Sequence, residues 1–291
     1  MLKKLLNKSS DYLSLVKFTH TIFALPFAMI GFSLAIHLMP ESFSYWLLLE
    51  VVLCMVFARN AAMAFNRYAD RKIDKMNPRT AIREIPAEVI QPKSALFFVI
   101  LNAVLFIATT YFINPLVFYL SPVALLVVLG YSYSKRFTWL AHLILGLGLS
   151  LAPIGAYLSV MGKFDIIPLL YSFIVLFWVA GFDIIYALQD EEFDKSQNLK
   201  SIPVFMGKRG ALNFSSILHA LTIAFIVMAG ILGGGKVLFW IGATIFIVLL
   251  IYQHFLVKPN DLSKVNLAFF TTNGIASVVF AGFVIADLFL L

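Results

Sequence analysis

Residues 94–134 read SALFFVILNAVLFIATTYFINPLVFYLSPVALLVVLGYSYS and contain no charged side chain over 41 positions. An α-helix rises about 1.5 Å per residue, so one helix of this length would be about twice the roughly 30 Å thickness of the bilayer hydrocarbon. Asn114 and Pro115 provide a turn signal at the middle. The stretch therefore predicts two membrane-spanning helices joined by a short turn.

The whole chain has the composition of a membrane protein. Of its 291 residues, 61% are hydrophobic and 13% are charged, whereas a soluble domain has roughly 45 to 50% apolar and about 25% charged residues. This balance excludes a water-soluble globular enzyme and a disordered chain. A single cysteine, Cys54, excludes a disulfide-linked scaffold.

The apolar runs and their breakers predict an all-α integral membrane protein with nine transmembrane helices around a central cavity. We expect one membrane-embedded domain over residues 1–291, in which the first span is retained because it is too long for a signal peptide and has no cleavage site. The expected spans lie near 19–38, 45–65, 94–112, 115–134, 138–160, 166–188, 211–232, 237–257 and 265–289.

The distribution of basic residues predicts the orientation. Of the 22 Lys and Arg residues, 19 fall in the N-terminal tail and in alternate loops, while Lys163 and Lys236 lie on the other side. Because positive loops stay inside, we expect a cytoplasmic N-terminus and an external C-terminus in a membrane such as the bacterial inner (plasma) membrane. Topology also accounts for the net charge of +7, so the lipid bilayer is expected as a partner and nucleic acid is not.

The acidic residues concentrate at two places on the predicted cytoplasmic side. Nine of the 15 fall at or after the ends of the second and sixth spans. At 100° per residue, Asn66, Asp70 and Asp74 share one face of a helix. Steps of seven and four residues likewise return Asp183, Asp190 and Asp194 to one face.

Paired carboxylates at a membrane boundary repel one another unless a cation neutralises them. Oxygen ligands without His or Cys beside them favour Mg²⁺, which usually completes its shell with phosphate oxygens and water. Nearby basic residues add donors for an anion, so the pattern predicts a metal-bridged diphosphate. The alternative for each cluster is a set of solvated caps or loop charges. The basic residues are Arg67, Arg71, Lys72, Arg79, Arg83 and Lys200.

The two clusters resemble the signatures of the UbiA superfamily of intramembrane aromatic prenyltransferases, NxxxDxxxD and a later DxxxD that is often preceded by an Asp and a Tyr. Asn66, Asp70 and Asp74 match the first, and Asp183, Tyr186, Asp190 and Asp194 match the second. The flanking stretches 17–27, 77–80 and 188–194 are most similar to the 4-hydroxybenzoate polyprenyltransferase-like group, whose members act in ubiquinone synthesis or in a futalosine route to menaquinone.

The resemblance implies Mg²⁺-dependent transfer of a polyprenyl group from polyprenyl diphosphate to an aromatic acid, such as 4-hydroxybenzoate or a menaquinone precursor. An allylic cation would be attacked by a ring carbon ortho to a phenol. The implied metal ligands are Asn66, Asp70, Asp74, Asp190 and Asp194, with Asp183 as a further catalytic carboxylate. The implied substrate-binding residues are Arg59, Arg71, Lys72, Arg79, Arg83, Arg136, Tyr186, Lys200 and His20.

Some of these residues have alternative roles. Arg59 lies on the face of Asn66 and either contacts substrate or forms a structural pair, for example with Glu50. Lys135 and Arg136 close the fourth span, where a basic residue either meets the acceptor carboxylate, as the resemblance suggests, or anchors the helix at the cytoplasmic side. His142, Asn102 and Asn273 are expected to bond neighbouring helices.

Two other functions fit the same helical pattern. A secondary transporter also pairs helical halves, but it should place its ionisable groups deep in discontinuous helices. A chain that keeps this fold without activity should have lost the motif carboxylates. Here the charges cluster at the cytoplasmic helix ends and the motif carboxylates are intact, which favours an enzyme.

Overall fold

The computed structural model describes residues 11–16 and 23–291, and these form an all-helical bundle without a β-sheet. His20 and the expected start of the first span lie outside the described residues. The helices are α2 (Leu25–Leu38), α3 (Tyr45–Met76), α4 (Pro92–Ile113), α5 (Pro115–Ser134), α6 (Ala141–Met161), α7 (Ile166–Ala187), α8 (Glu191–Ser196), α9 (Ile202–Leu232), α10 (Val237–Leu256) and α11 (Asn273–Leu290).

Eight helical segments of the described chain are long and apolar enough to cross a membrane. The helix α2 has 14 residues and is about 21 Å long, which is shorter than the hydrocarbon core. It packs against α6 and α11 within the bundle. The described helices thus agree with eight of the nine expected spans. The remaining one, the first expected span near 19–38, corresponds to the shorter helix α2.

Local signals place the helix ends close to the expected turns. Asn114 caps α5, its side chain accepting a hydrogen bond of 2.9 Å from the amide of Val117, and Pro115 occupies the first turn. In contrast, α3 continues to Met76, beyond the expected end near 65. Its charged last turns therefore project from the apolar part of the bundle on a rigid helix.

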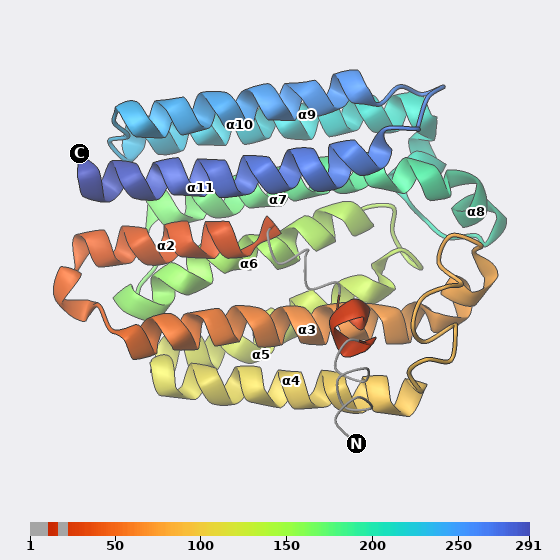
Figure 1. Ribbon diagram of the computed structural model, residues 1–291, viewed down its shortest axis with the longest axis horizontal. Helices are drawn as coiled ribbons and strands as arrows, with labels where there is room; N and C mark the ends of the chain where they lie inside the picture. Colours follow the sequence, from red (N-terminus) through yellow and green to blue (C-terminus); the bar gives the residue numbers. More distant parts are fainter. Residues whose placement is uncertain (1–10, 17–22) are drawn as a thin grey trace.

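The two acidic segments lie at the same end of the molecule. Figure 1 shows α8 beside the connection between α3 and α4, at the end opposite the C-terminus. The short 3₁₀ helix η3 (Leu188–Asp190) and α8 extend the line of α7 there. In α9, Gly207 has a φ of 67°, which breaks the helix near its start.

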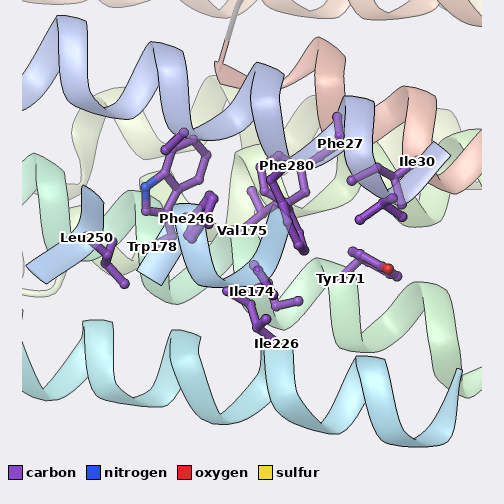
Figure 2. Close-up of a cluster of buried hydrophobic side chains, with 14 of the residues drawn as sticks. Phe27, Ile30, Tyr171, Ile174, Val175, Trp178, Ile226, Phe246, Leu250 and Phe280 are labelled. Atoms are coloured by element: carbon purple, nitrogen blue, oxygen red, sulfur yellow. The ribbon is translucent and has the colours of Figure 1, made fainter. Parts of the chain in front are cut away.

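A cluster of buried aromatic and aliphatic side chains forms the core between α2, α7, α9, α10 and α11 (Figure 2). Trp178 of α7 is fully buried, packs against Phe27 and Phe246, and donates a hydrogen bond of 2.8 Å from Nε1 to Asn273 Oδ1. This interhelical bond satisfies a buried indole in an apolar environment, as expected for Asn273.

Small residues let α2 approach α6 closely. A Cβ atom added to Gly31 would lie 2.0 Å from the carbonyl oxygen of Pro153. The backbones therefore meet at a distance that only glycine permits, a common feature of helix contacts in membranes.

We expect Gly31→Ala to destabilise the protein by about 1 to 3 kcal/mol, because the new methyl group forces the two backbones apart. The measurement is the temperature at which half of the detergent-solubilised protein is lost from the monodisperse peak in size-exclusion chromatography. Gly282→Ala is the matched control, since no atom lies within 4 Å of its added Cβ. Equal melting of both variants would contradict this packing.

Candidate active site

A cavity of about 1110 Å³ lies between α3, α5, α6 and α7. Along α3 its wall extends from Val51 to Arg67, about 24 Å of helix. The walls contributed by α5 and α6 are mainly aliphatic. The polar end is lined by Arg59, Asn66, Arg67, Arg79, Arg83 and Glu84. This shape suits a ligand with an anionic head and a long apolar tail.

Asp70 is buried and paired with the end of α5. Its Oδ2 lies 2.7 Å from Lys135 Nζ, and its Oδ1 lies 3.4 Å from Arg136 Nη2. Asn66 donates a weaker hydrogen bond of 3.4 Å to the same carboxylate. The predicted shared face of Asn66 and Asp70 is therefore present, and cations from another helix neutralise it.

Asp190 joins the second acidic segment to the first. Asn77 Nδ2 donates to its Oδ1 over 3.1 Å, and Arg79 binds it through Nε over 2.9 Å and through Nη2. Arg79 also donates from Nη1 to the hydroxyl of Tyr186 over 2.9 Å. Burial alone would lower the pKa of Arg79, but its hydrogen bond and charge interaction with Asp190 raise that pKa above its usual value.

Asp74 has one paired and one unpaired oxygen. Arg83 Nη1 donates to Oδ1 over 2.7 Å, whereas the buried Oδ2 has no hydrogen-bond partner among the described residues. The guanidinium of Arg67 is nearby and 95% buried, and its Nε and Nη1 also lack partners in the described chain. A buried acceptor and a buried donor without partners indicate a site for a cation and an anion together.

Three expected basic residues lie away from this cavity. Arg71 donates to the carbonyl of Tyr68 over 2.7 Å, and with Lys72 it lines a separate, smaller hollow. Lys200 donates from Nζ to the carbonyl of Phe137 over 3.1 Å. On α3, positions 67, 70 and 74 are buried, whereas Arg71 is half-buried, Lys72 is exposed and neither lines the cavity. Proximity in sequence therefore did not place these two basic residues at the site.

Other expected residues are close to the cavity. Arg59 lines it and donates to the carbonyl of Val16 over 2.9 Å. Arg136 donates to the carbonyl of Ala69 over 2.8 Å, so it holds the end of α5 against α3. Asp194 follows on α8 and interacts electrostatically with Asp190. Tyr186 lines the cavity above the Arg79 guanidinium.

For two residues of the network the sequence did not indicate the observed partner. Lys135 forms the shortest ion pair of Asp70, and Asn77 links the loop after α3 to Asp190. The Asn-Pro-Arg-Thr stretch at 77–80 was a usable signal for the second. No local pattern distinguishes Lys135 from an ordinary membrane anchor.

The carboxylate oxygens of the site could bind magnesium only together with ligands from outside the protein. Within the described ranges, no three His, Cys, Asp or Glu side chains converge to hold an ion by themselves. The carboxylates are oxygen donors, and the unpartnered Asp74 Oδ2 is available to a cation. Magnesium bound through a few carboxylates takes its remaining oxygens from phosphate and water. The residues therefore fit Mg²⁺ when it is bound together with a diphosphate.

The fold and site define a helical integral membrane protein with a charged chamber at the end of an apolar cavity. A model of the UbiA prenyltransferase family matches residues 24–275. The chain belongs to this family and is a prenyl-transferring enzyme, which excludes the transporter hypothesis.

Curated relatives extend over most of the chain. The 4-hydroxybenzoate octaprenyltransferase of Tolumonas auensis is 29% identical over 243 residues, which cover 84% of this chain and 85% of that protein. The enzyme of the same name from Saccharophagus degradans is 30% identical over 263 residues, covering 86% and 87%.

Solved structures share the fold. A UbiA homologue from Aeropyrum pernix K1 has a TM-score of 0.83 and 29% identity, covering 92% of this chain and 98% of that one. A UbiA homologue from Archaeoglobus fulgidus bound to DMAPP and Mg²⁺ has a TM-score of 0.77 and 22% identity, covering 97% and 100%. The second likeness concerns the fold alone.

We expect Arg79→Ala to release the loop between α3 and α4, because this side chain is the main link from that loop to Asp190. Hydrogen exchange followed by mass spectrometry should show faster exchange in residues 77–90. Lys75→Ala is the control, since Lys75 and Glu88 are 68% and 85% exposed and lie 3.9 Å apart, a pair expected to contribute little. Unchanged exchange in Arg79→Ala would refute this linkage.

Proposed function

We propose that the protein catalyses the Mg²⁺-dependent transfer of a polyprenyl group from polyprenyl diphosphate to an aromatic acid. The acceptor is 4-hydroxybenzoate or a related quinone precursor, in ubiquinone or menaquinone biosynthesis. The observation that carries this proposal is the cavity: Arg67, Arg79 and Arg83 line one end, and from Arg67 its α3 wall runs about 24 Å to Val51, mostly apolar apart from Asn66 and Arg59. The names of the curated relatives support the aromatic acceptor.

The diphosphate binds at the basic end. Arg67 offers a buried guanidinium with unused donors, and guanidinium groups suit phosphate oxygens because they donate two parallel hydrogen bonds. Arg79 and Arg83 line the cavity but are paired with Asp190 and Asp74. When donor and Mg²⁺ bind, these partners would exchange, with the carboxylates holding the metal and the arginines binding the diphosphate.

This exchange keeps every charge neutralised. Asp70, Asp74, Asp190 and Asp194, with Asn66, supply the oxygen ligands, and bound Mg²⁺ would stabilise the negative charge of the departing diphosphate. Arg67, Arg79 and Arg83 share that stabilisation. The surrounding apolar wall keeps water away from the allylic cation, and the rings of Tyr186 and Phe269, 4.2 Å apart, lie beside its path.

The acceptor lies between the diphosphate site and the apolar wall. Its carboxylate requires a cation, and Arg59 supplies one on the cavity wall, where its Nη1 also donates to the carbonyl of Val16. Arg136 stays with Ala69 and Asp70 in this arrangement. The charged chamber faces the cytoplasm, with the N-terminus cytoplasmic and the C-terminus outside, in the bacterial inner membrane.

Arg67→Met is expected to raise the KM for the prenyl diphosphate by about 10- to 100-fold, because a charge-assisted contact of about 1.5 to 3 kcal/mol is lost. Arg71→Met is the matched control on the same helix, since its side chain points away from the cavity, and it should keep the wild-type KM. The measurement is initial-rate kinetics with purified protein in detergent. Equal KM changes in both variants would place the diphosphate elsewhere.

Purified protein incubated with 4-hydroxybenzoate, a polyprenyl diphosphate and Mg²⁺ should yield a ring-prenylated product by mass spectrometry. EDTA should abolish it, and Asp70→Ala or Asp190→Ala should abolish it while the protein remains monodisperse. Diphosphate release without this product indicates a different aromatic acceptor, to be tested with naphthoic acids. EDTA-insensitive transfer would overturn the metal assignment.

A further inference from the structure

Asp183 differs from Asp70, Asp74 and Asp190 in its partner and in lining the cavity. The described Asp70, Asp74 and Asp190 side chains pair with lysine or arginine, whereas Asp183 forms no such ion pair with any described residue. Its Oδ2 lies 2.7 Å from Nδ1 of His142, on α6. Of the two acidic side chains that line the cavity among the described residues, Glu84 is at the basic rim and Asp183 is on α7.

Asp183 also lies deeper than the expected metal ligands. It precedes Asp190 by seven residues along α7 and η3, a distance of about 10 Å at 1.5 Å per residue. A diphosphate held at Asp190 and Asp74 would direct its first carbon into the cavity toward this level. The side chains of Phe182, Tyr186 and Phe269 line the cavity around it, which forms an aromatic environment for an acceptor ring.

His142 lies behind Asp183 and does not line the cavity. It is buried, and its Nε2 has no partner in the described part of the chain. Because a carboxylate offers only acceptors, His142 Nδ1 carries the hydrogen and donates it to Asp183. This bond holds Oδ2 against α6, while Oδ1 has no hydrogen-bond partner among the described residues and Asp183 itself lines the cavity.

We propose that Asp183 is the proton acceptor of the transfer reaction and that His142 is a positioning residue for its carboxylate. The proposal rests on the proposed function. The allylic carbon–oxygen bond breaks with its electron pair leaving on the diphosphate, and a pair from the ring forms the new carbon–carbon bond. The electrons of the ring carbon–hydrogen bond then restore aromaticity, and the proton passes to the free oxygen of Asp183.

The test separates proton removal from donor activation. Wild-type protein and Asp183→Asn are incubated with geranyl diphosphate, Mg²⁺ and 4-hydroxybenzoate, either normal or deuterated at both ring positions ortho to the hydroxyl. In Asp183→Asn we expect transfer to fall about 100-fold or more, while geraniol formed by water capture of the cation persists. A primary deuterium isotope effect on transfer should appear that the wild type lacks.

His142 variants provide the second arm. His142→Ala should lower kcat about 10- to 100-fold through a misplaced carboxylate and raise the ratio of geraniol to transfer product. His142→Asn, which retains an N–H donor at a similar position, should restore most of the wild-type ratio. Glu88→Gln is the control for a carboxylate outside the cavity, since Glu88 is 85% exposed, and it should keep the wild-type ratio and isotope effect.

Two results would overturn the assignment. One is a wild-type product ratio and isotope effect in folded Asp183→Asn, and the other is complete loss of donor consumption, which would make Asp183 part of the diphosphate site. If Asp183→Asn does not fold, equal product ratios in His142→Ala and His142→Asn also contradict it. Failure of the wild type to prenylate any aromatic acid would instead refute the proposed function.

Discussion

Neutralisation of buried carboxylates is the constraint on which this site depends. A charge removed from water is costly unless a partner compensates for it, and this cost is greater beside an apolar membrane region. Each of three carboxylates pairs with a basic side chain outside its own helix. Asp70 pairs with Lys135 at the end of α5, whereas Asp74 and Asp190 pair with Arg83 and Arg79, both in the loop after α3. The same ion pairs therefore hold the loops together and neutralise the carboxylates that we propose as metal ligands.

This arrangement explains why Arg67, Arg79 and Arg83, rather than Asp70, Asp74 and Asp190, line the cavity. A ligand that brings both a cation and an anion can replace each internal pair without leaving a charge unpaired. Asp74 Oδ2 and the Nε and Nη1 atoms of Arg67 have no hydrogen-bond partner among the described residues. At these atoms such a ligand can bind without first breaking an internal bond. A preformed metal site without such partners would hold several like charges together.

The apolar part of the molecule serves the same site in a different way. The aromatic core around Trp178 and the close approach of Gly31 to α6 fix the helices that form the cavity walls. Rigid walls can exclude water over a long apolar length, which a reactive allylic cation requires. Asp183 lies on one of these walls, where the fixed bond to His142 determines its direction.

The sequence by itself determined the helical membrane fold, because charge-free runs as long as a bilayer leave few alternatives to helices. It also located the two acidic motifs, and helical periodicity gave the shared face of Asn66 and Asp70 on α3, whereas the 3₁₀ helix Leu188–Asp190 interrupts that periodicity in the second motif. The sequence did not show that Lys135 pairs with Asp70, that Arg71 and Lys72 point away, or that α2 is only 14 residues long. Only the tertiary structure decided these points, because ion-pair partners come from helices far apart in the chain and their choice depends on packing.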